Sequence, residues 1–99
     1  MYARVVRYHV DPDRCDEALE ALEEAVKQIG DIEGITGGYL LVDGDAGRII
    51  TITLWENQAA LEASEVRASR LRQEALHAVE GDIESVERLR VASEIGDDA

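Results

Sequence analysis

The segment Arg48-Ile49-Ile50-Thr51-Ile52-Thr53-Leu54-Trp55-Glu56-Asn57 decides the fold of this chain. Its β-branched residues predict one strand. Alternation gives this strand an aliphatic face, Ile50, Ile52 and Leu54, and a mixed face, Ile49, Thr51, Thr53 and Trp55. A strand with apolar residues on both faces needs cover on both sides. The chain's own helices can cover one side, so we expect a second subunit on the other.

The size of the chain predicts a single folded domain. It has 99 residues, of which 45% are hydrophobic. This length supplies one hydrophobic core, and the composition is that of a folded chain. We expect the domain to span residues 1–95 and residues 96–99 to form a disordered tail.

The charge excludes two classes of partner. The formal net charge is −12, from 22 acidic and 10 basic residues. Such a surface repels nucleic-acid phosphates and anionic lipids. No segment approaches the roughly 20 apolar residues of a membrane span. We therefore expect no nucleic-acid or membrane partner. The single cysteine, Cys15, cannot form an intrachain disulfide, so we expect a cytoplasmic protein.

The other elements follow from hydrophobic periodicity and turn residues. The first helix begins near Pro12, and either Asp11 or Asp13 can cap it. Its apolar stripe ends before Gly30. The sequence predicts strands over residues 2–10, 35–42, 48–56 and 83–95. A hairpin turn with two positive-φ glycines is expected over residues 43–47. A second helix should run from Asn57 to near Gly81, with a break at Ser64-Glu65.

The order βαββαβ predicts a ferredoxin-like α+β fold, with a four-stranded antiparallel sheet and two helices on one face. The aliphatic set of residues 48–56 then lies on the open face, where a large apolar patch is rare in soluble monomers. Pairing two sheets would bury roughly 800 Å² per subunit. We therefore predict a homodimer that closes through the sheet face into an α+β barrel.

Several segments resemble a known family. Gly34-Ile35 and Gly38–Asp43, followed by Leu54-Trp55-Glu56-Asn57 with Ala60-Leu61, are similar to the antibiotic biosynthesis monooxygenase domain. This family belongs to the dimeric α+β barrel superfamily, and the order of elements agrees over nearly the whole chain. The superfamily includes cofactor-free quinone-forming oxygenases, haem-degrading enzymes and isomerases, as well as members without known activity.

The haem-degrading branch of this superfamily has a distinct residue pattern. It typically has an asparagine in the first strand, a tryptophan after the third strand and a histidine on the second helix. Trp55 matches, but Val6 stands near the asparagine position and Glu65 or Val66 near the histidine position. The resemblance therefore implies a branch that works without a cofactor.

The candidate site centres on Trp55. The resemblance implies a pocket of polar and aromatic residues in which Trp55 and Tyr8 carry the chemistry and Tyr39 contacts the substrate. Thr51 and Thr53 share the face of Trp55 and form a suitable pocket wall. The indole could stack on a flat aromatic substrate and donate its N–H to a substrate oxygen. The alternative is that Trp55 closes the core beneath the second helix.

Other reactive side chains have simpler explanations. His9 has no visible orienting partner, His77 suits the end of a helix, and neighbouring acids should make Cys15 inert. Too few histidines and cysteines are present for a zinc site, so we expect no metal. The second helix also carries Arg67, Arg70 and Arg72, which could bind a carboxylate or pair with acids such as Glu74. On the last strand, Arg88 and Arg90 could pair with acids across the dimer.

Two functions remain open. The first is a cofactor-independent monooxygenase-like enzyme acting on a small flat aromatic or quinol-like molecule. Such a substrate supplies its own electrons to dioxygen, so the protein needs only to orient, desolvate and deprotonate it. The alternative is a non-catalytic dimeric module of the same fold that binds a small ligand or assembles. A filled pocket beside Trp55 would favour the module.

Overall fold

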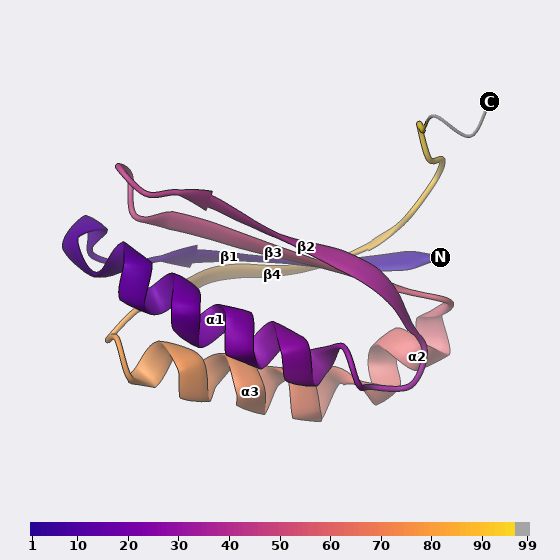
Figure 1. Cartoon of the computed structure of the whole chain (residues 1–99). Coiled ribbons are helices and arrows are strands. Elements are labelled where there is room, and N and C mark those ends of the chain that lie inside the picture. Colours follow the sequence, from indigo (N-terminus) through magenta and orange to yellow (C-terminus); the bar gives the residue numbers. More distant parts are fainter. Residues whose placement is uncertain (97–99) are drawn as a thin grey trace.

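The computed structural model describes residues 1–96 and contains a single antiparallel sheet covered by helices on one face (Figure 1). The elements are β1 (Tyr2–His9), η1 (Pro12–Arg14), α1 (Cys15–Ile29), β2 (Ile35–Asp43), β3 (Arg48–Trp55), α2 (Gln58–Ala63), α3 (Glu65–His77) and β4 (Asp82–Arg90). The four strands lie in the order β2-β3-β1-β4. This arrangement confirms the predicted ferredoxin-like fold.

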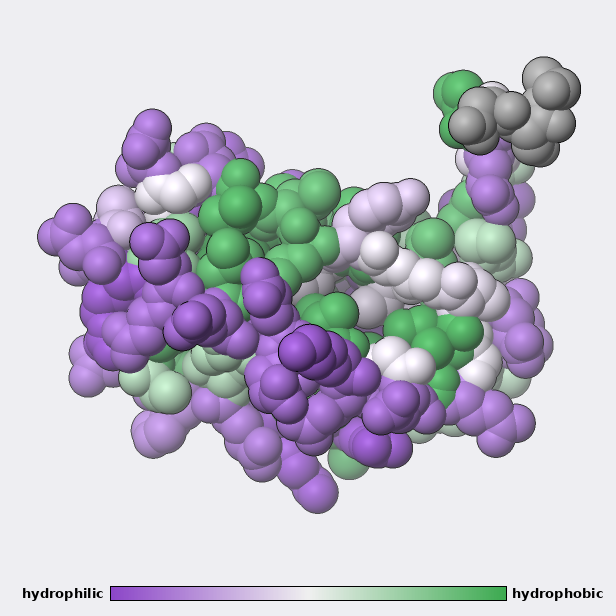
Figure 2. Space-filling view, in the orientation of Figure 1, coloured by the Kyte–Doolittle hydropathy of each residue, from purple (hydrophilic) through white to green (hydrophobic). Residues whose placement is uncertain are grey.

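The two faces of β3 differ in their cover as the sequence predicts. Its mixed set, which ends with Trp55, is buried, whereas Ile50, Ile52 and Leu54 remain half-buried. The register with β1 pairs Val6 with Thr51 and Val5 with Ile52, so Val6 shares the helix-covered face. Figure 2 shows hydrophobic side chains gathered over the upper part of the molecule, where β2 lies, and hydrophilic ones over the helical layer.

The start of α1 resolves the two predicted caps. The Asp11 carboxylate accepts a hydrogen bond from the Asp13 amide at 2.9 Å and caps η1, with Pro12 in its first turn. The α-helix itself begins at Cys15 and buries one stripe against the sheet. It ends at Ile29, and Gly30, its C-cap residue, keeps a right-handed helical backbone.

The predicted second helix is two helices that meet at Ser64. Asn57 caps α2 by accepting a hydrogen bond from the Ala60 amide at 2.8 Å. The Ser64 hydroxyl donates to the Leu61 carbonyl at 2.7 Å, and α3 starts at the next residue. The break expected at Ser64-Glu65 is confirmed. None of the helices in the described part is long and apolar enough to cross a membrane.

Two details differ from the prediction. The fourth strand ends at Arg90 instead of Ile95, because β1, its neighbour in the sheet, begins at Tyr2, the partner of Arg90. Of the two hairpin glycines only Gly47, at φ +65°, takes a positive φ. Of the predicted disordered tail, residues 97–99 lie outside the described residues.

Candidate ligand-binding site

The hydrophobic core is divided into two clusters. One contains Val6, Tyr8, Val10, Cys15, Ala18, Leu22, Ile49, Leu76 and Val79, and the other contains Ile29, Trp55, Leu61 and Ala68. Along α3, Arg72 lies one turn from Ala68 on one side and from Leu76 on the other. Along β3, Thr51 and Thr53 separate Ile49 from Trp55. A buried polar layer therefore runs between the two clusters, and we define it as Arg4, Thr51, Thr53 and Arg72.

Arg4 connects the polar layer to the junction of α2 and α3. Its side chain is 1% exposed. The Nη2 atom donates to the Leu61 carbonyl at 2.9 Å, to the Ser64 hydroxyl at 3.0 Å and to a Glu65 carboxylate oxygen at 2.8 Å. The guanidinium carbon also lies 5.5 Å from the centroid of the Trp55 ring, within cation–π range. One nitrogen of Arg4 thus fixes where the helical layer meets the sheet.

The remaining donors of the polar layer are unpaired. Within residues 1–96, Arg4 Nε and Nη1 and Arg72 Nε have no hydrogen-bond partner, although all three are buried. Burial lowers the pKa of both guanidinium groups, and for Arg4 the charge of Glu65 acts in the opposite direction. Arginine keeps its proton in proteins, so both side chains remain cations.

Glu65 is the acid that faces this positive charge. Its carboxylate accepts hydrogen bonds from Arg4 and from Arg88, the latter at 2.6 Å. The hydrogen bond from Arg88 and the charges of Arg4 and Arg88 lower the pKa of Glu65, against a smaller opposing effect of burial. Arg88 therefore pairs within its own subunit, which corrects the expectation that it pairs across a dimer.

We expect Glu65→Gln to lower the free energy of unfolding at pH 7 by about 1–2 kcal/mol. This is less than for a fully buried pair, because solvent reaches Glu65. A carboxylate with a lowered folded pKa stabilises the fold above its unfolded pKa of about 4.3, and that contribution is lost as the pH falls through the folded value. Urea unfolding at pH 7 and pH 3 measures the difference, and Glu74→Gln, on the exposed side of α3, is the control. A loss of equal size at both pH values contradicts this account.

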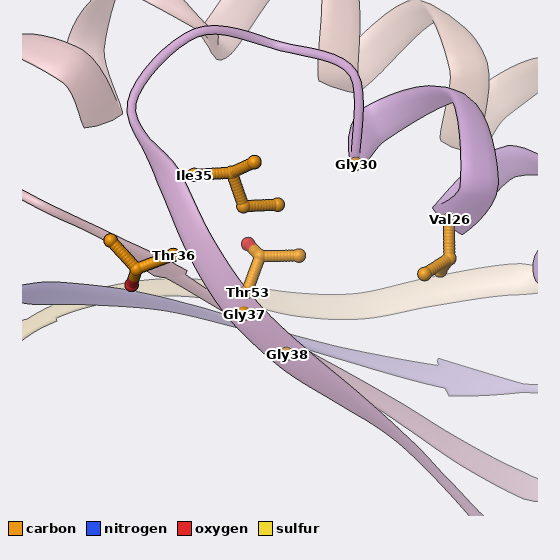
Figure 3. Close-up of a pocket in the computed structure, with 7 residues that line it drawn as sticks. All are labelled: Val26, Gly30, Ile35, Thr36, Gly37, Gly38 and Thr53. Carbon is orange, nitrogen blue, oxygen red and sulfur yellow. The ribbon is translucent and has the colours of Figure 1, made fainter.

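A cavity of about 390 Å³ opens between the end of α1 and the start of β2 (Figure 3). Its lining residues are Val26, Gly30, Ile35, Thr36, Gly37, Gly38 and Thr53. The sheet register sets Gly38 opposite Thr53 and Thr53 opposite Arg4. The cavity wall at Thr53 is therefore one strand away from Arg4, and Thr53 belongs to both the cavity and the polar layer.

The structure places Trp55 behind this wall. The indole is fully buried in the second cluster and donates its N–H to the Thr53 hydroxyl at 3.0 Å. Trp55 is not among the residues that line the cavity. Its side chain closes the core beneath α2, as the alternative interpretation expected, and it reaches the cavity through Thr53.

The other predicted site residues fall on both faces of the sheet. Tyr8 and Thr51 are buried with their hydroxyl oxygens 3.2 Å apart, and burial raises the pKa of Tyr8. Tyr39 is 63% exposed and pairs with Ile52 on the open face. The family resemblance grouped Tyr39 with Trp55, but the two lie on opposite faces of the sheet, because one residue of register changes the face to which a strand side chain points.

The remaining candidates are also dispersed. Arg72 points inward, whereas Arg67 and Arg70 are exposed, so the predicted basic cluster is not one surface. Cys15 is buried, and burial followed by the charge of Asp16 raises its thiol pKa. Sequence reasoning missed Arg4. The signal was present, since Arg4 is the one charged residue on the face that it shares with Tyr2, Val6, Tyr8 and Val10.

The fold and this site together define a small α+β domain with a polar layer inside its helix-covered core. A family model described as "Antibiotic biosynthesis monooxygenase" matches residues 1–75. The chain therefore belongs to the antibiotic biosynthesis monooxygenase family, which confirms the resemblance noted in the sequence.

Solved structures agree with this fold. A candidate antibiotic biosynthesis monooxygenase from Deinococcus radiodurans has a TM-score of 0.79 at 12% identity, with all of both chains covered. SnoaB, a cofactor-independent oxygenase from Streptomyces nogalater, has a TM-score of 0.72 at 16% identity, with 97% of each chain covered. At these identities the likeness concerns the fold alone. The comparison with curated proteins found no significant match.

Proposed function

We propose that this protein is a cofactor-independent monooxygenase-like enzyme for a small flat aromatic or quinol-like molecule. The observation that carries the proposal is the buried polar layer, which meets an open cavity at Thr53 between two apolar clusters. Membership of the family supports it. The fold shared with SnoaB, itself a cofactor-independent oxygenase, adds further support.

The chemistry needs no group beyond substrate and dioxygen. A hydroxyarene loses its hydroxyl proton, and the resulting phenolate transfers an electron to dioxygen. A carbon–oxygen bond then forms at a ring carbon that carries hydrogen. Loss of that hydrogen as a proton and cleavage of the oxygen–oxygen bond release water and leave a quinone. The sum is one hydroxyarene and one dioxygen giving one quinone and one water.

The chain's residues would supply position and electrostatics. Positive charge on Arg4 and Arg72 favours the phenolate over the phenol. Thr51 and Thr53 offer hydroxyl groups to the substrate, while Tyr8 and Trp55 hold these hydroxyls from behind through the hydrogen bonds described above. The apolar clusters on either side exclude water from the aromatic ring. Tyr39 has no part in this site.

Filling the cavity is expected to abolish ligand binding and turnover together. Val26 lines the cavity from α1, so Val26→Phe places a ring where the substrate would enter (Figure 3). We expect dioxygen uptake with 1-naphthol, measured with an oxygen electrode, to fall at least about tenfold while thermal stability changes little. Val66→Phe makes the same substitution at an exposed position of α3 and should leave uptake unchanged.

The alternative is a non-catalytic dimeric module that binds a small ligand or assembles. It is favoured by Trp55, whose N–H is already bonded within the core. Calorimetric binding of 1-naphthol without dioxygen uptake or quinone absorbance would support this alternative and reject the enzyme.

The proposed assembly is a homodimer through the open sheet face. The exposed apolar side chains of this face are Tyr39, Leu41 and Leu89, beside the half-buried aliphatic row of β3. A second copy supplies matching apolar surface because the same face is used by both partners. The cytoplasmic location stays a prediction.

A further inference from the structure

Arg4 and Arg72 form a site whose charge has no counterpart of equal size among the described residues. We propose that these two arginines bind an oxyanion carried by the aromatic ligand, either a carboxylate or a phenolate. The inference rests on the proposed ligand-binding role of the cavity and names the chemical class of its ligand. It follows from charge balance, from unused hydrogen-bond donors and from position.

Charge balance favours a negatively charged ligand. The side chains that act electrostatically on Arg4 are Glu65, Arg72 and Arg88, so one carboxylate faces three guanidinium groups. Arg88 is half-exposed and takes the shorter of the two contacts with Glu65. Arg72, 4% exposed, is left without an ion pair in the described part of the chain. Glu65 also acts on Arg72 electrostatically, but its carboxylate oxygens bond to Arg4 and Arg88. A buried charge without a bonded partner is costly.

The unused donors match an oxyanion. Among the described residues, Arg4 Nε and Nη1 and Arg72 Nε have no hydrogen-bond partner, and each is shielded from solvent. Both two-donor edges of the Arg4 guanidinium include Nη2, which already bonds to Leu61, Ser64 and Glu65, so Nε and Nη1 can each donate one separate hydrogen bond. The oxygens of an anion have enough lone pairs to accept such single hydrogen bonds. A neutral amide or ketone would accept hydrogen bonds but leave the charge in place. A buried N–H without a partner is costly, so a ligand that supplies the missing acceptor gains binding free energy.

The position connects these donors to the cavity. Gly38, Thr53 and Arg4 are successive partners across β2, β3 and β1 on the helix-covered side. Arg4 and Arg72 do not line the cavity, so a ligand reaches the Arg4 guanidinium only by passing Thr53, the register partner of Arg4. The indole of Trp55 beside that guanidinium and the apolar clusters on both sides suit a flat ring. The cavity volume is within the range of small-molecule sites.

The test compares 2-naphthoate with its neutral isostere, 2-naphthamide, by isothermal titration calorimetry. We expect the wild-type protein to bind the carboxylate at least about tenfold more tightly. Arg72→Gln keeps a hydrogen-bonding side chain but removes the charge, and should reduce the ratio of the two affinities to near one. The control, Arg70→Gln, removes the same charge from an exposed side chain two residues earlier, so the ratio of the two affinities should stay as in the wild type.

Two further measurements separate the possible oxyanions and control for folding. If phenolate is the recognised group, 2-naphthol bound to wild-type protein should show its phenolate absorbance at lower pH than when it is bound to Arg72→Gln. Arg72→Lys keeps the charge, so a folded Arg72→Lys protein should retain part of the carboxylate preference. Circular dichroism checks the folding of each variant.

Several outcomes overturn the inference. A ratio that survives Arg72→Gln would reject the oxyanion site. Equal affinities for the two isosteres in the wild type, or no binding of either, would reject it when 2-naphthol also shows no phenolate shift. Turnover of 1-naphthol without carboxylate preference or phenolate shift would reject it while leaving the proposed oxygenase intact. Carboxylate preference without dioxygen uptake supports the site and transfers it to the non-catalytic alternative.

Discussion

Replacing Trp55 with alanine is expected to lower the free energy of unfolding by about 3–5 kcal/mol, the usual range for removing a large buried aromatic side chain. The indole is fully buried and packs with Ile29, Leu61 and Ala68. The substitution also removes the hydrogen bond to Thr53 and leaves the Arg4 guanidinium without its aromatic neighbour. Urea unfolding followed by circular dichroism measures this loss of stability. Tryptophan fluorescence cannot be used, because the variant lacks the chain's only tryptophan.

Trp55→Phe separates packing from ligand contact. It keeps most of the apolar volume but removes the N–H, so the free energy of unfolding should fall by about 1–2 kcal/mol. If the indole acts on the ligand only through Thr53, affinity for 2-naphthoate should change less than about threefold. A complete loss of affinity in a stable Trp55→Phe protein would instead place the indole in direct contact with the ligand.

The fold was predictable because local signals agree with each other. Alternation along residues 48–56 fixed which side of the sheet the helices cover, and Asn57 and Ser64 marked the ends of α2. The end of β4 was not predictable, since Val91 and Ile95 continue the alternating pattern past Arg90. The strand ends opposite Tyr2, where its antiparallel partner β1 begins, and that limit depends on pairing between distant segments.

The site was less predictable for the same physical reason. The alternation of side chains along β3 placed Thr53 and Trp55 on one face. It could not predict the hydrogen bonds of Arg4, whose partners are 57 to 61 residues away in the chain. Arg72 lies two residues after Arg70 on the same helix, so only the helical period distinguishes the buried arginine from the exposed one. Tyr39 was misplaced because its strand enters through a register shift between Ile35 and Gly37.

Ile52→Asp is expected to convert the protein from a dimer to a monomer. Ile52 is central on the open face, where it pairs with Val5 on one side and Tyr39 on the other. A carboxylate there would be buried without a partner in a sheet-to-sheet interface. A loss of about 3 kcal/mol in association free energy would weaken the dimer roughly 100-fold. Size-exclusion chromatography with light scattering at micromolar concentration should change from twice the monomer mass to the monomer mass.

The control for Ile52→Asp places the same charge outside the predicted interface. Val66 is 73% exposed on α3, in the helical layer on the other side of the sheet. Val66→Asp should therefore remain dimeric. On the open face itself, Arg7, the register partner of Ile50, pairs with Glu87 at 3.2 Å and forms part of a polar rim, which is the usual surround of an apolar interface core. A wild-type protein that is monomeric at these concentrations, or an Ile52→Asp protein that stays dimeric, would show that β3 buries its aliphatic row in another way.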